Sequence, residues 1–211
     1  TNIDCGTASR VMGKVSVVMT WLTVVDVATD KTIRRVGPID NMIWPHTFNG
    51  RQTLSFCNVD HIVGFEVCDL QTGKKLHTVR VKGLEDQRRR CHGIGMNPDE
   101  TEIWLVDQDR KRHYIFDATV MPPVEKGYVD VSAKTHGWIT FSMDGAYAYP
   151  DSGDVIDAKN KKTLTRLRDA DGNTALHLAC KAGQISTCEV LLASGARTDA
   201  RNDAGDTALH L

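Results

Sequence analysis

Three histidines recur at a nearly constant interval, and together they could bind a transition metal. His46, His92 and His136 are separated by 46 and 44 residues, and each lies near the start of a short apolar segment. Neutral imidazole is a common ligand of zinc and copper, so rings that converge in space would provide a metal site. The alternative is a structural role, in which each histidine hydrogen-bonds to the neighbouring segment and fixes its register.

Two short runs of basic residues could bind an anion or an acidic partner. The six cations are Arg88, Arg89, Arg90, Arg110, Lys111 and Arg112. Grouped on one face, they would attract a phosphate, a carboxylate or an acidic protein, although the chain as a whole is nearly neutral. Asp107 and Asp109 would neutralise part of this charge. The alternative is a solvated surface without a binding role.

The chain lacks the common motifs of catalytic and nucleotide-binding sites. It contains no G-x-S-x-G, no H-E-x-x-H, no G-x-x-x-x-G-K-[ST] and no G-x-G-x-x-G. These patterns place a nucleophile, a metal or a phosphate at a defined position on a turn or helix. We therefore identify no catalytic residue, and an enzyme is less favoured than a binding protein.

Composition and charge narrow the class of partner. The 211 residues include 26 basic and 27 acidic side chains, for a net charge of −1, which gives no overall attraction to nucleic acid or to a membrane surface. No apolar run approaches the roughly 18 residues that a membrane-spanning helix requires. We therefore expect a protein partner, and neither nucleic acid nor membrane.

The cysteines indicate a reducing compartment. They are Cys5, Cys57, Cys68, Cys91, Cys180 and Cys188. None belongs to a C-x-x-C pair, so buried reduced thiols are the simplest interpretation, and this slightly favours the cytoplasm. No cofactor is expected, and a transition metal at the three histidines is the alternative.

An aspartate recurs after a short apolar strand and divides most of the chain into copies. These aspartates are Asp26, Asp69, Asp117 and Asp157, with spacings of 43, 48 and 40 residues. Turn residues follow each aspartate, and a further strand-like stretch follows each turn. Four short strands in each 40–50 residues or so are typical of a β-propeller blade, whose apolar faces are buried by stacking on neighbouring blades.

These copies resemble YVTN-type β-propeller repeats, relatives of WD40 blades, over residues 14–167. The resemblance rests on His92-Gly-Ile-Gly-Met-Asn-Pro-Asp and on the copy that begins at Thr135-His-Gly-Trp. Three blades are complete, and residues 14–36 make most of a fourth. We expect residues 1–13 to be a poorly ordered lead-in.

The propeller resemblance also implies a place for the histidines. In such propellers the first strand of each blade lines a central channel, so the three histidines would ring one mouth of it. Some propellers of this kind bind copper there, and lactonase-type propellers place acids and arginines on one face. A metal-binding or lactonase-like protein is therefore the alternative function.

After residue 167 the apolar period changes to that of a helix. Thr174-Ala-Leu-His177-Leu recurs 33 residues later as Thr207-Ala-Leu-His210-Leu, and Leu191-Leu-x-x-Gly-Ala lies between them. These motifs resemble an ankyrin repeat over residues 168–211, with helices at 174–182 and 185–194. Thr174 is the expected N-cap of the first helix. The resemblance implies that His177 and His210 hydrogen-bond to neighbouring loops.

An ankyrin repeat implies a protein partner. The expected contact residues are Lys181, Arg197, Asp199, Arg201, Asn202 and Asp203. The expected fold is mainly β, with about four four-stranded antiparallel blades and a helical ankyrin element, and the expected function is a non-catalytic interaction or scaffold protein. An open row of blades and an incomplete ankyrin array leave apolar faces uncovered, so we expect a fragment or fusion product that self-associates.

Overall fold

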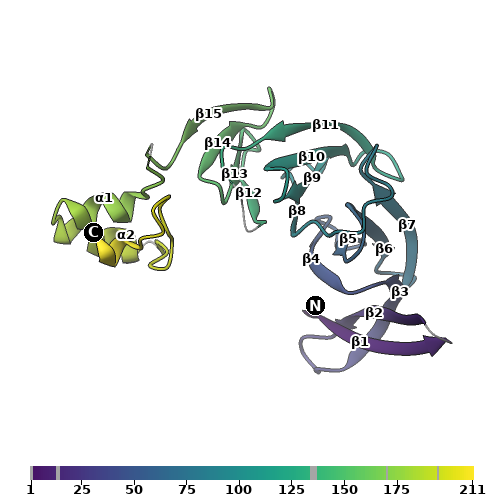
Figure 1. The fold of residues 1–211 in the computed structure, drawn as a ribbon. Helices are drawn as coiled ribbons and strands as arrows, with labels where there is room; N and C mark the ends of the chain where they lie inside the picture. The colour runs from purple at the N-terminus through teal and green to yellow at the C-terminus, as the bar shows by residue number, and fades with distance from the viewer. Residues whose placement is uncertain (1, 13–14, 134–136, 170, 194) are drawn as a thin grey trace.

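The structure, a computed structural model, describes residues 2–12, 15–133, 137–169, 171–193 and 195–211. Within these ranges the strands form four antiparallel sheets that follow one another along an arc, and two helices follow the last sheet (Figure 1). The expected mainly β fold with a short helical element at the C-terminal end is confirmed.

Each sheet is built from strands that are consecutive in the chain. The first contains β1 (Asn2–Met12), β2 (Val15–Val25) and β3 (Thr32–Asp40), and the second contains β4 (Ile43–Phe48), β5 (Leu54–Val59), β6 (Gly64–Asp69) and β7 (Lys74–Arg80). The third contains β8 (Gly93–Met96), β9 (Glu102–Asp107), β10 (Arg112–Asp117) and β11 (Val124–Asp130). The fourth contains β12 (Ile139–Phe141), β13 (Tyr147–Pro150), β14 (Asp154–Asp157) and β15 (Lys162–Arg166). This up-and-down order is that of propeller blades.

The N-terminal segment differs from the expected lead-in. Residues 2–12 form β1, which pairs antiparallel with β2 along its whole length, from Asn2 opposite Val25 to Met12 opposite Val15. The expectation of an irregular segment at residues 1–13 is therefore wrong for residues 2–12. This segment does not sustain an alternation of apolar and polar residues along its length, and its strand conformation depends on backbone pairing with β2, which local sequence does not reveal.

The recurring aspartates make the same local turn in all four sheets. The carboxylate of Asp26 accepts hydrogen bonds from the backbone N–H groups of Ala28 and Thr29, and Asp69 repeats the arrangement two and three residues further along. Asp117 and Asp157 also accept from the backbone N–H two residues on. Hydrogen bonds lower the pKa of all four carboxyl groups, chiefly from the Thr29 and Thr119 hydroxyls at Asp26 and Asp117 and from backbone N–H groups at Asp69 and Asp157. The aspartate therefore caps the turn that leads into the last strand of each sheet.

The hydrophobic core is divided among the spaces between neighbouring sheets. Representative side chains are Leu22 and Cys57 between the first two sheets, Phe65 and Phe116 between the second and third, and Trp104 and Ile156 between the third and fourth. Every residue of β9 is buried, because its sheet has a neighbour on each side. β7 and β11, the last strands of their sheets, instead alternate exposed and partly buried residues.

The two end sheets each have one face without a neighbouring sheet. In the last sheet Ala148 is fully buried, whereas the preceding Tyr147 points to the opposite face and is 40% exposed. In the first sheet Trp21 likewise alternates with the fully buried Leu22. Both helices lie beyond the last sheet, separated from it in Figure 1, so the arc remains open at both ends.

A buried histidine lies in the core between the third and fourth sheets. His113, on β10, is fully buried, and neither ring nitrogen has a hydrogen-bond partner among the described residues. Its ring centroid lies 6.5 Å from that of Trp104. Burial lowers the pKa of His113 to about 4, and the charge of Asp154 opposes only part of that shift. The imidazole is therefore neutral at pH 7 and acts as a core side chain.

We expect His113 to make the protein less stable in mild acid. The pKa of His113 in the folded protein lies below its ordinary value of about 6.5. The stability that depends on the neutral ring is therefore fully present above about pH 6.5 and is lost as the pH falls toward 4. The expected loss over that range is about 3 kcal/mol. Urea unfolding at pH 7 and pH 4.5 measures it. His113→Phe should unfold with a smaller dependence on pH in this window, the remainder coming from other groups such as His46, and an unchanged dependence in the variant would contradict the assignment.

The ankyrin element contains α1 (Ala175–Lys181), α2 (Ile185–Ala193) and a single turn of 3-10 helix at Ala208–His210. Thr174 caps α1, since its Oγ1 accepts from the backbone N–H of His177 and the His177 ring accepts from the Thr174 N–H. His177 Nε2 lies 3.0 Å from the carbonyl oxygen of Asp206 in the next loop. The expected cap is confirmed, and the expected link between loops is confirmed for His177, whereas the hydrogen bonds described for His210 are with Thr207 in its own turn.

The connection between the sheets and the helices is a hydrogen-bonded turn. β15 ends at Arg166, and the guanidinium of Arg168 donates to the carbonyl oxygens of Gly172 at 3.2 Å and Arg201 at 2.9 Å. No strand pairing continues across the described part of this connection. The division into a propeller part at 14–167 and an ankyrin part at 168–211 stays a prediction.

Neither α1 nor α2 is long and apolar enough to cross a membrane.

Candidate binding surfaces

The histidines predicted to line a channel lie on the inner side of the arc. His46 is on β4 and His92 directly precedes β8, the first strands of the second and third sheets, which Figure 1 shows facing the concave side. The ring of His46 packs edge-on against Phe48, with centroids 4.9 Å apart, and burial lowers the pKa of His46. His136 lies outside the described residues.

His92 belongs to a row of rings that crosses three sheets. Its centroid lies 5.4 Å from that of Trp44 and 6.1 Å from that of Trp138. The guanidinium of Arg90 lies over the Trp44 ring, 3.9 Å from its centroid. The Trp44 Nε1 donates a hydrogen bond to Asp60 at 2.7 Å. Aromatic and cation–π packing therefore holds the inner strands of adjacent sheets together.

The described residues do not form a complete metal site. They contain no group of three or more His, Cys, Asp or Glu side chains placed to hold a metal ion. His46 and His92 supply two nitrogen donors, whereas protein zinc sites use three or four protein ligands. A metal site at the three histidines would depend on His136 and stays a prediction.

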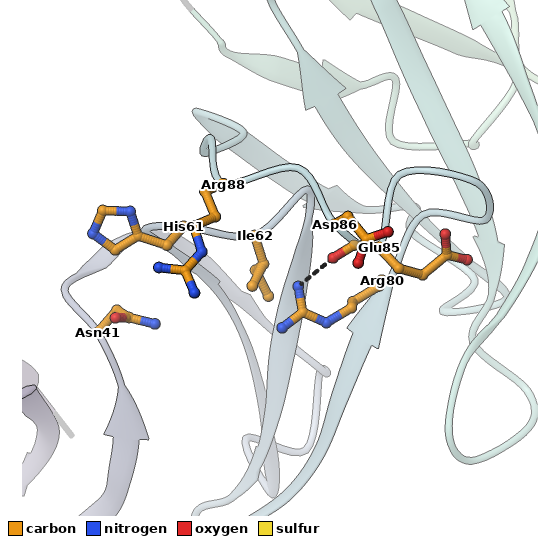
Figure 2. A pocket seen from close by; sticks show the side chains of 7 residues that line it. All are labelled: Asn41, His61, Ile62, Arg80, Glu85, Asp86 and Arg88. Atoms are coloured by element: carbon orange, nitrogen blue, oxygen red, sulfur yellow. Dashed lines mark hydrogen bonds between the residues drawn. The ribbon is translucent and has the colours of Figure 1, made fainter.

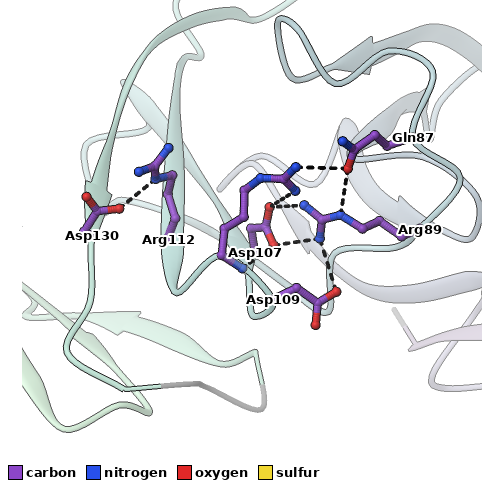
Figure 3. A network of polar contacts seen from close by, with 7 residues as sticks. Gln87, Arg89, Asp107, Asp109, Arg112 and Asp130 are labelled. Atoms are coloured by element: carbon purple, nitrogen blue, oxygen red, sulfur yellow. Dashed lines mark hydrogen bonds and ion pairs between the residues drawn. The ribbon is translucent and has the colours of Figure 1, made fainter.

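Most of the predicted basic surface is paired with carboxylates. Arg89 binds both carboxylate oxygens of the fully buried Asp107, at 2.7 Å from Nη1 to Oδ1 and through Nη2 to Oδ2, and contacts Asp109 at 3.4 Å (Figure 3). Arg110 also reaches Asp107, at 3.5 Å. Gln87 Oε1 accepts from Arg89 at 3.2 Å and Arg110 at 3.1 Å. This network joins the β7–β8 connection to the β9–β10 turn, so it acts as a structural clamp.

The other basic residues separate into different environments. Arg112 binds the exposed Asp130 at 2.7 Å and lies over the Tyr128 ring at 3.5 Å. Arg90 binds Asp60 at 3.5 Å in addition to its contact with Trp44. Arg88 and Lys111 have no ion pair in the part of the chain that the structure describes. Four of the six cations that were expected to form one patch are therefore held in ion pairs. Arg88 and Lys111 are the two that are not, among the described residues.

Arg88 lines a polar hollow of about 360 Å3 between the end of the first sheet, the second sheet and the β7–β8 connection. Its lining residues are Asn41, His61, Ile62, Arg80, Glu85, Asp86 and Arg88. Figure 2 shows Asn41, His61 and Arg88 on one side and Arg80, Glu85 and Asp86 on the other. The two carboxylates offset the two guanidinium groups, so this hollow has no strong preference for an anion.

A second hollow lies on the ankyrin element and collects half of the predicted contact residues. It has a volume of about 340 Å3 and is lined by Asp171, Asn173, Lys181, Asn202, Asp203, Ala204 and Leu211. The Asn202 amide donates to the Asn173 side-chain oxygen at 3.0 Å, and the Asp203 backbone N–H donates to the Asp171 carbonyl at 3.0 Å. These bonds align the two loops, so that the Lys181 ammonium shares a polar surface with the carboxylates.

The other predicted contact residues of the ankyrin element form hydrogen bonds within their own loop. Arg197 forms two hydrogen bonds with the carboxylate of Asp199, at 3.0 and 2.9 Å. Arg201 donates to the carbonyl oxygen of Gly205. Both pairs are exposed, and neither contributes to the ankyrin hollow.

The sequence interpretation missed the aromatic row and the clamp. Trp44 and Trp138 each lie two residues from a histidine that was singled out, as Trp-Pro-His46 and His-Gly-Trp138, and that proximity was an available signal. Gln87 gave no signal, because an isolated glutamine between charged residues is ordinary on a surface.

Comparisons with known proteins support both parts of the architecture. Residues 154–211 match the family description "Ankyrin repeats (3 copies)", a range that begins before the helices, at β14. Hydrazine synthase of Kuenenia stuttgartiensis aligns with 71% of this chain and 45% of its own, at 14% identity and a TM-score of 0.58. The β-propeller domain of Cps50 (Swd1) from Myceliophteria thermophila aligns with 71% of this chain and 50% of its own, at 15% identity and a TM-score of 0.54. No curated protein matches.

These identities are low, so the structural likeness shows the fold alone. The ankyrin and propeller resemblances are confirmed at that level, while the assignment of the blades to the YVTN type stays a prediction. The chain spans about half the length of the propeller structures it matches. Ankyrin repeats together with propeller-like sheets suggest a protein that uses its repeats for protein interaction.

Proposed function

We propose that this chain is a non-catalytic interaction or scaffold protein, in which YVTN-like, WD40-like blades and an ankyrin element present separate binding surfaces. The observation that carries the proposal is the ankyrin hollow, where Lys181, Asn202 and Asp203 meet on one polar surface. Solenoid repeats present surfaces of this kind to protein partners.

The chemistry of the ankyrin hollow fits an extended segment of a partner protein. Asn173 and Asn202 offer amide groups that can donate to and accept from a peptide backbone. Lys181 can bind a carboxylate of the partner, and Asp171 and Asp203 can bind a basic side chain. A partner segment that carries both signs of charge would therefore match it, whereas the uniformly anionic backbone of a nucleic acid would not.

The test is a charge reversal at Lys181. Peptides selected from a displayed random library on the full chain should bind Lys181→Glu about tenfold more weakly, because the substitution replaces an attraction at the hollow with a repulsion. Fluorescence anisotropy of labelled peptides gives the dissociation constants. Lys162→Glu, an exposed lysine on β15, is the matched control and should bind normally. Equal binding by all three proteins, or no selected peptide, would overturn the proposal.

A metal-binding propeller, including a lactonase-like enzyme, is the second candidate. One observation favours it, since the buried Nδ1 of His92 has no hydrogen-bond partner among the described residues, and His92 directly precedes β8, a strand on the concave side of the arc (Figure 1). A transition metal there would act as a Lewis acid or an electron-transfer centre. The described residues provide too few ligands to derive any step through such a metal.

Metal analysis separates the two candidates. If the scaffold proposal holds, the full chain dialysed against zinc and then copper should retain less than stoichiometric metal, and His92→Ala should not change that amount. Stoichiometric metal that is lost in His92→Ala but kept in His61→Ala, an exposed histidine away from the inner strands, would favour the metal-binding function instead. Elemental mass spectrometry gives the metal content.

A further inference from the structure

Two cysteines of the ankyrin element lie in contact across its helix pair. Cys180 is in the last turn of α1 and Cys188 is in the first half of α2, and their Sγ atoms are 3.5 Å apart. Both side chains are partly exposed. A disulfide requires the sulfurs to approach to about 2.05 Å, a change of about 1.5 Å that side-chain rotation can supply when the Cβ atoms already face each other.

The backbone between the two cysteines sets their separation. The N–H of Gly183 donates to the carbonyl of Cys180 at 2.9 Å, and the N–H of Cys188 donates to the carbonyl of Gln184 at 3.0 Å. Gly183 adopts φ of 63°, which lets the chain leave α1 and enter α2 within a few residues. The contact between the thiols therefore follows from a hydrogen-bonded turn, not from one side-chain rotamer.

The cysteines of the sheets are in a different environment. Cys57, Cys68 and Cys91 are fully buried in the cores between sheets. Burial raises the pKa of the Cys91 thiol well above its usual range, so it stays protonated and unreactive. Among the described cysteines, only Cys180 and Cys188 combine access to solvent with a neighbouring thiol.

We propose that Cys180 and Cys188 form a reversible thiol-oxidation site, which converts to an intramolecular disulfide in the presence of a peroxide or a small-molecule disulfide. With a small disulfide, the thiolate of one cysteine attacks and forms a mixed disulfide, releasing one thiol. The second cysteine, as thiolate, then displaces the other thiol and closes the bond, so two protons and two electrons leave the protein. With hydrogen peroxide, the first thiolate becomes a sulfenic acid with loss of one hydroxide, and the second displaces water.

The disulfide would strengthen a poorly packed part of the chain. α2 contains no buried residue, whereas α1 buries Leu176, His177 and Ala179. A covalent link from α2 to the end of α1 would hold α2 in place without any additional core. Lys181, which lines the ankyrin hollow, directly follows Cys180. Oxidation would therefore also restrict the position of Lys181 in that hollow.

Oxidation should be slow at neutral pH and faster in base. Burial and the contact with Cys180 raise the pKa of Cys188, so the reactive thiolate is scarce at pH 7 and its fraction rises as the pH increases. A slow reaction of this kind responds to sustained oxidising conditions and leaves the pair reduced under ordinary cytoplasmic conditions.

The experiment uses the full chain with oxidised glutathione and, separately, with hydrogen peroxide. Intact mass should fall by two hydrogens, and trypsin cleavage at Lys181 should yield two peptides that stay joined until a reductant is added. The midpoint of the thermal loss of helical circular dichroism should rise by about 10 °C in the oxidised form. Cys188→Ser should instead accumulate a glutathione adduct on Cys180.

Three results would overturn the proposal. One is glutathione adducts on both cysteines without a disulfide, and another is a disulfide from either cysteine to a different cysteine. The third is no oxidation under conditions that fully oxidise a model dithiol peptide. Circular dichroism of Cys188→Ser in the reduced state checks that the helices remain folded, so a failure to cross-link is not mistaken for unfolding.

Discussion

Replacing Arg89 with methionine is expected to lower the free energy of unfolding by about 3 kcal/mol, one of the larger effects of any single substitution in this chain. Asp107 is fully buried, and Arg89 binds both of its carboxylate oxygens. Removing the guanidinium leaves a buried carboxylate that retains the backbone N–H of Arg110, at 3.1 Å, and the longer contact with the Arg110 guanidinium, at 3.5 Å. Urea unfolding followed by tryptophan fluorescence measures the change.

Arg112→Met provides the matched control. Arg112 makes an equally short contact with Asp130, at 2.7 Å, but Asp130 is 62% exposed, so water and salt screen the pair. The expected loss for this variant is below about 1 kcal/mol. If both substitutions cost the same, burial does not decide the strength of these pairs and the clamp interpretation fails. The double variant Arg89→Met/Asp107→Leu should recover part of the loss, because it leaves no buried charge unpaired.

The isolated chain is expected to self-associate through the open faces of its end sheets. Each internal sheet buries apolar side chains on both faces, whereas the first and last sheets each have one face without a neighbouring sheet. An uncovered face of several hundred Å2 forgoes on the order of 10 kcal/mol of hydrophobic stabilisation, which is comparable to the whole stability of a domain. Contact between copies would recover part of it.

Light scattering and thermal unfolding over a range of concentrations test this expectation. The mean mass should exceed that of the monomer, and the unfolding midpoint should rise with concentration. Tyr147→Lys, on the open face of the last sheet, should reduce the association, while Leu76→Lys, an exposed position on an internal sheet, should not. A monodisperse monomer with one sharp, concentration-independent transition would show that the open faces do not drive association between copies.

The self-association and oxidation experiments are independent of each other. The cysteines of the sheets whose side chains the structure describes, Cys57, Cys68 and Cys91, are all buried. The thiol pair lies on the helices, beyond the last sheet. A chain that associates can therefore still be scored for its intramolecular disulfide, provided that non-reducing gels exclude disulfides between copies.

Features that depend on hydrogen bonds within a few residues could be predicted from the sequence alone. The aspartate turns at Asp69 and Asp157 use N–H groups two and three residues away, so the repeat of strands and turns was visible in the residue order. The Thr174–His177 cap spans three residues and likewise identified the start of the ankyrin helix. Local patterns of this kind determined the number and order of most elements.

Only the tertiary structure decided which of the candidate residues could act. Arg89 and Asp107 are 18 residues apart and meet because the β7–β8 connection crosses the β9–β10 turn, which turned a predicted binding surface into a structural clamp. His92 meets Trp44 and Trp138 from two other sheets, and β1 exists through its pairing with β2. Such contacts follow from the stacking of sheets and the pairing of strands, which bring together residues far apart in the chain, and neither composition nor local periodicity contains that information.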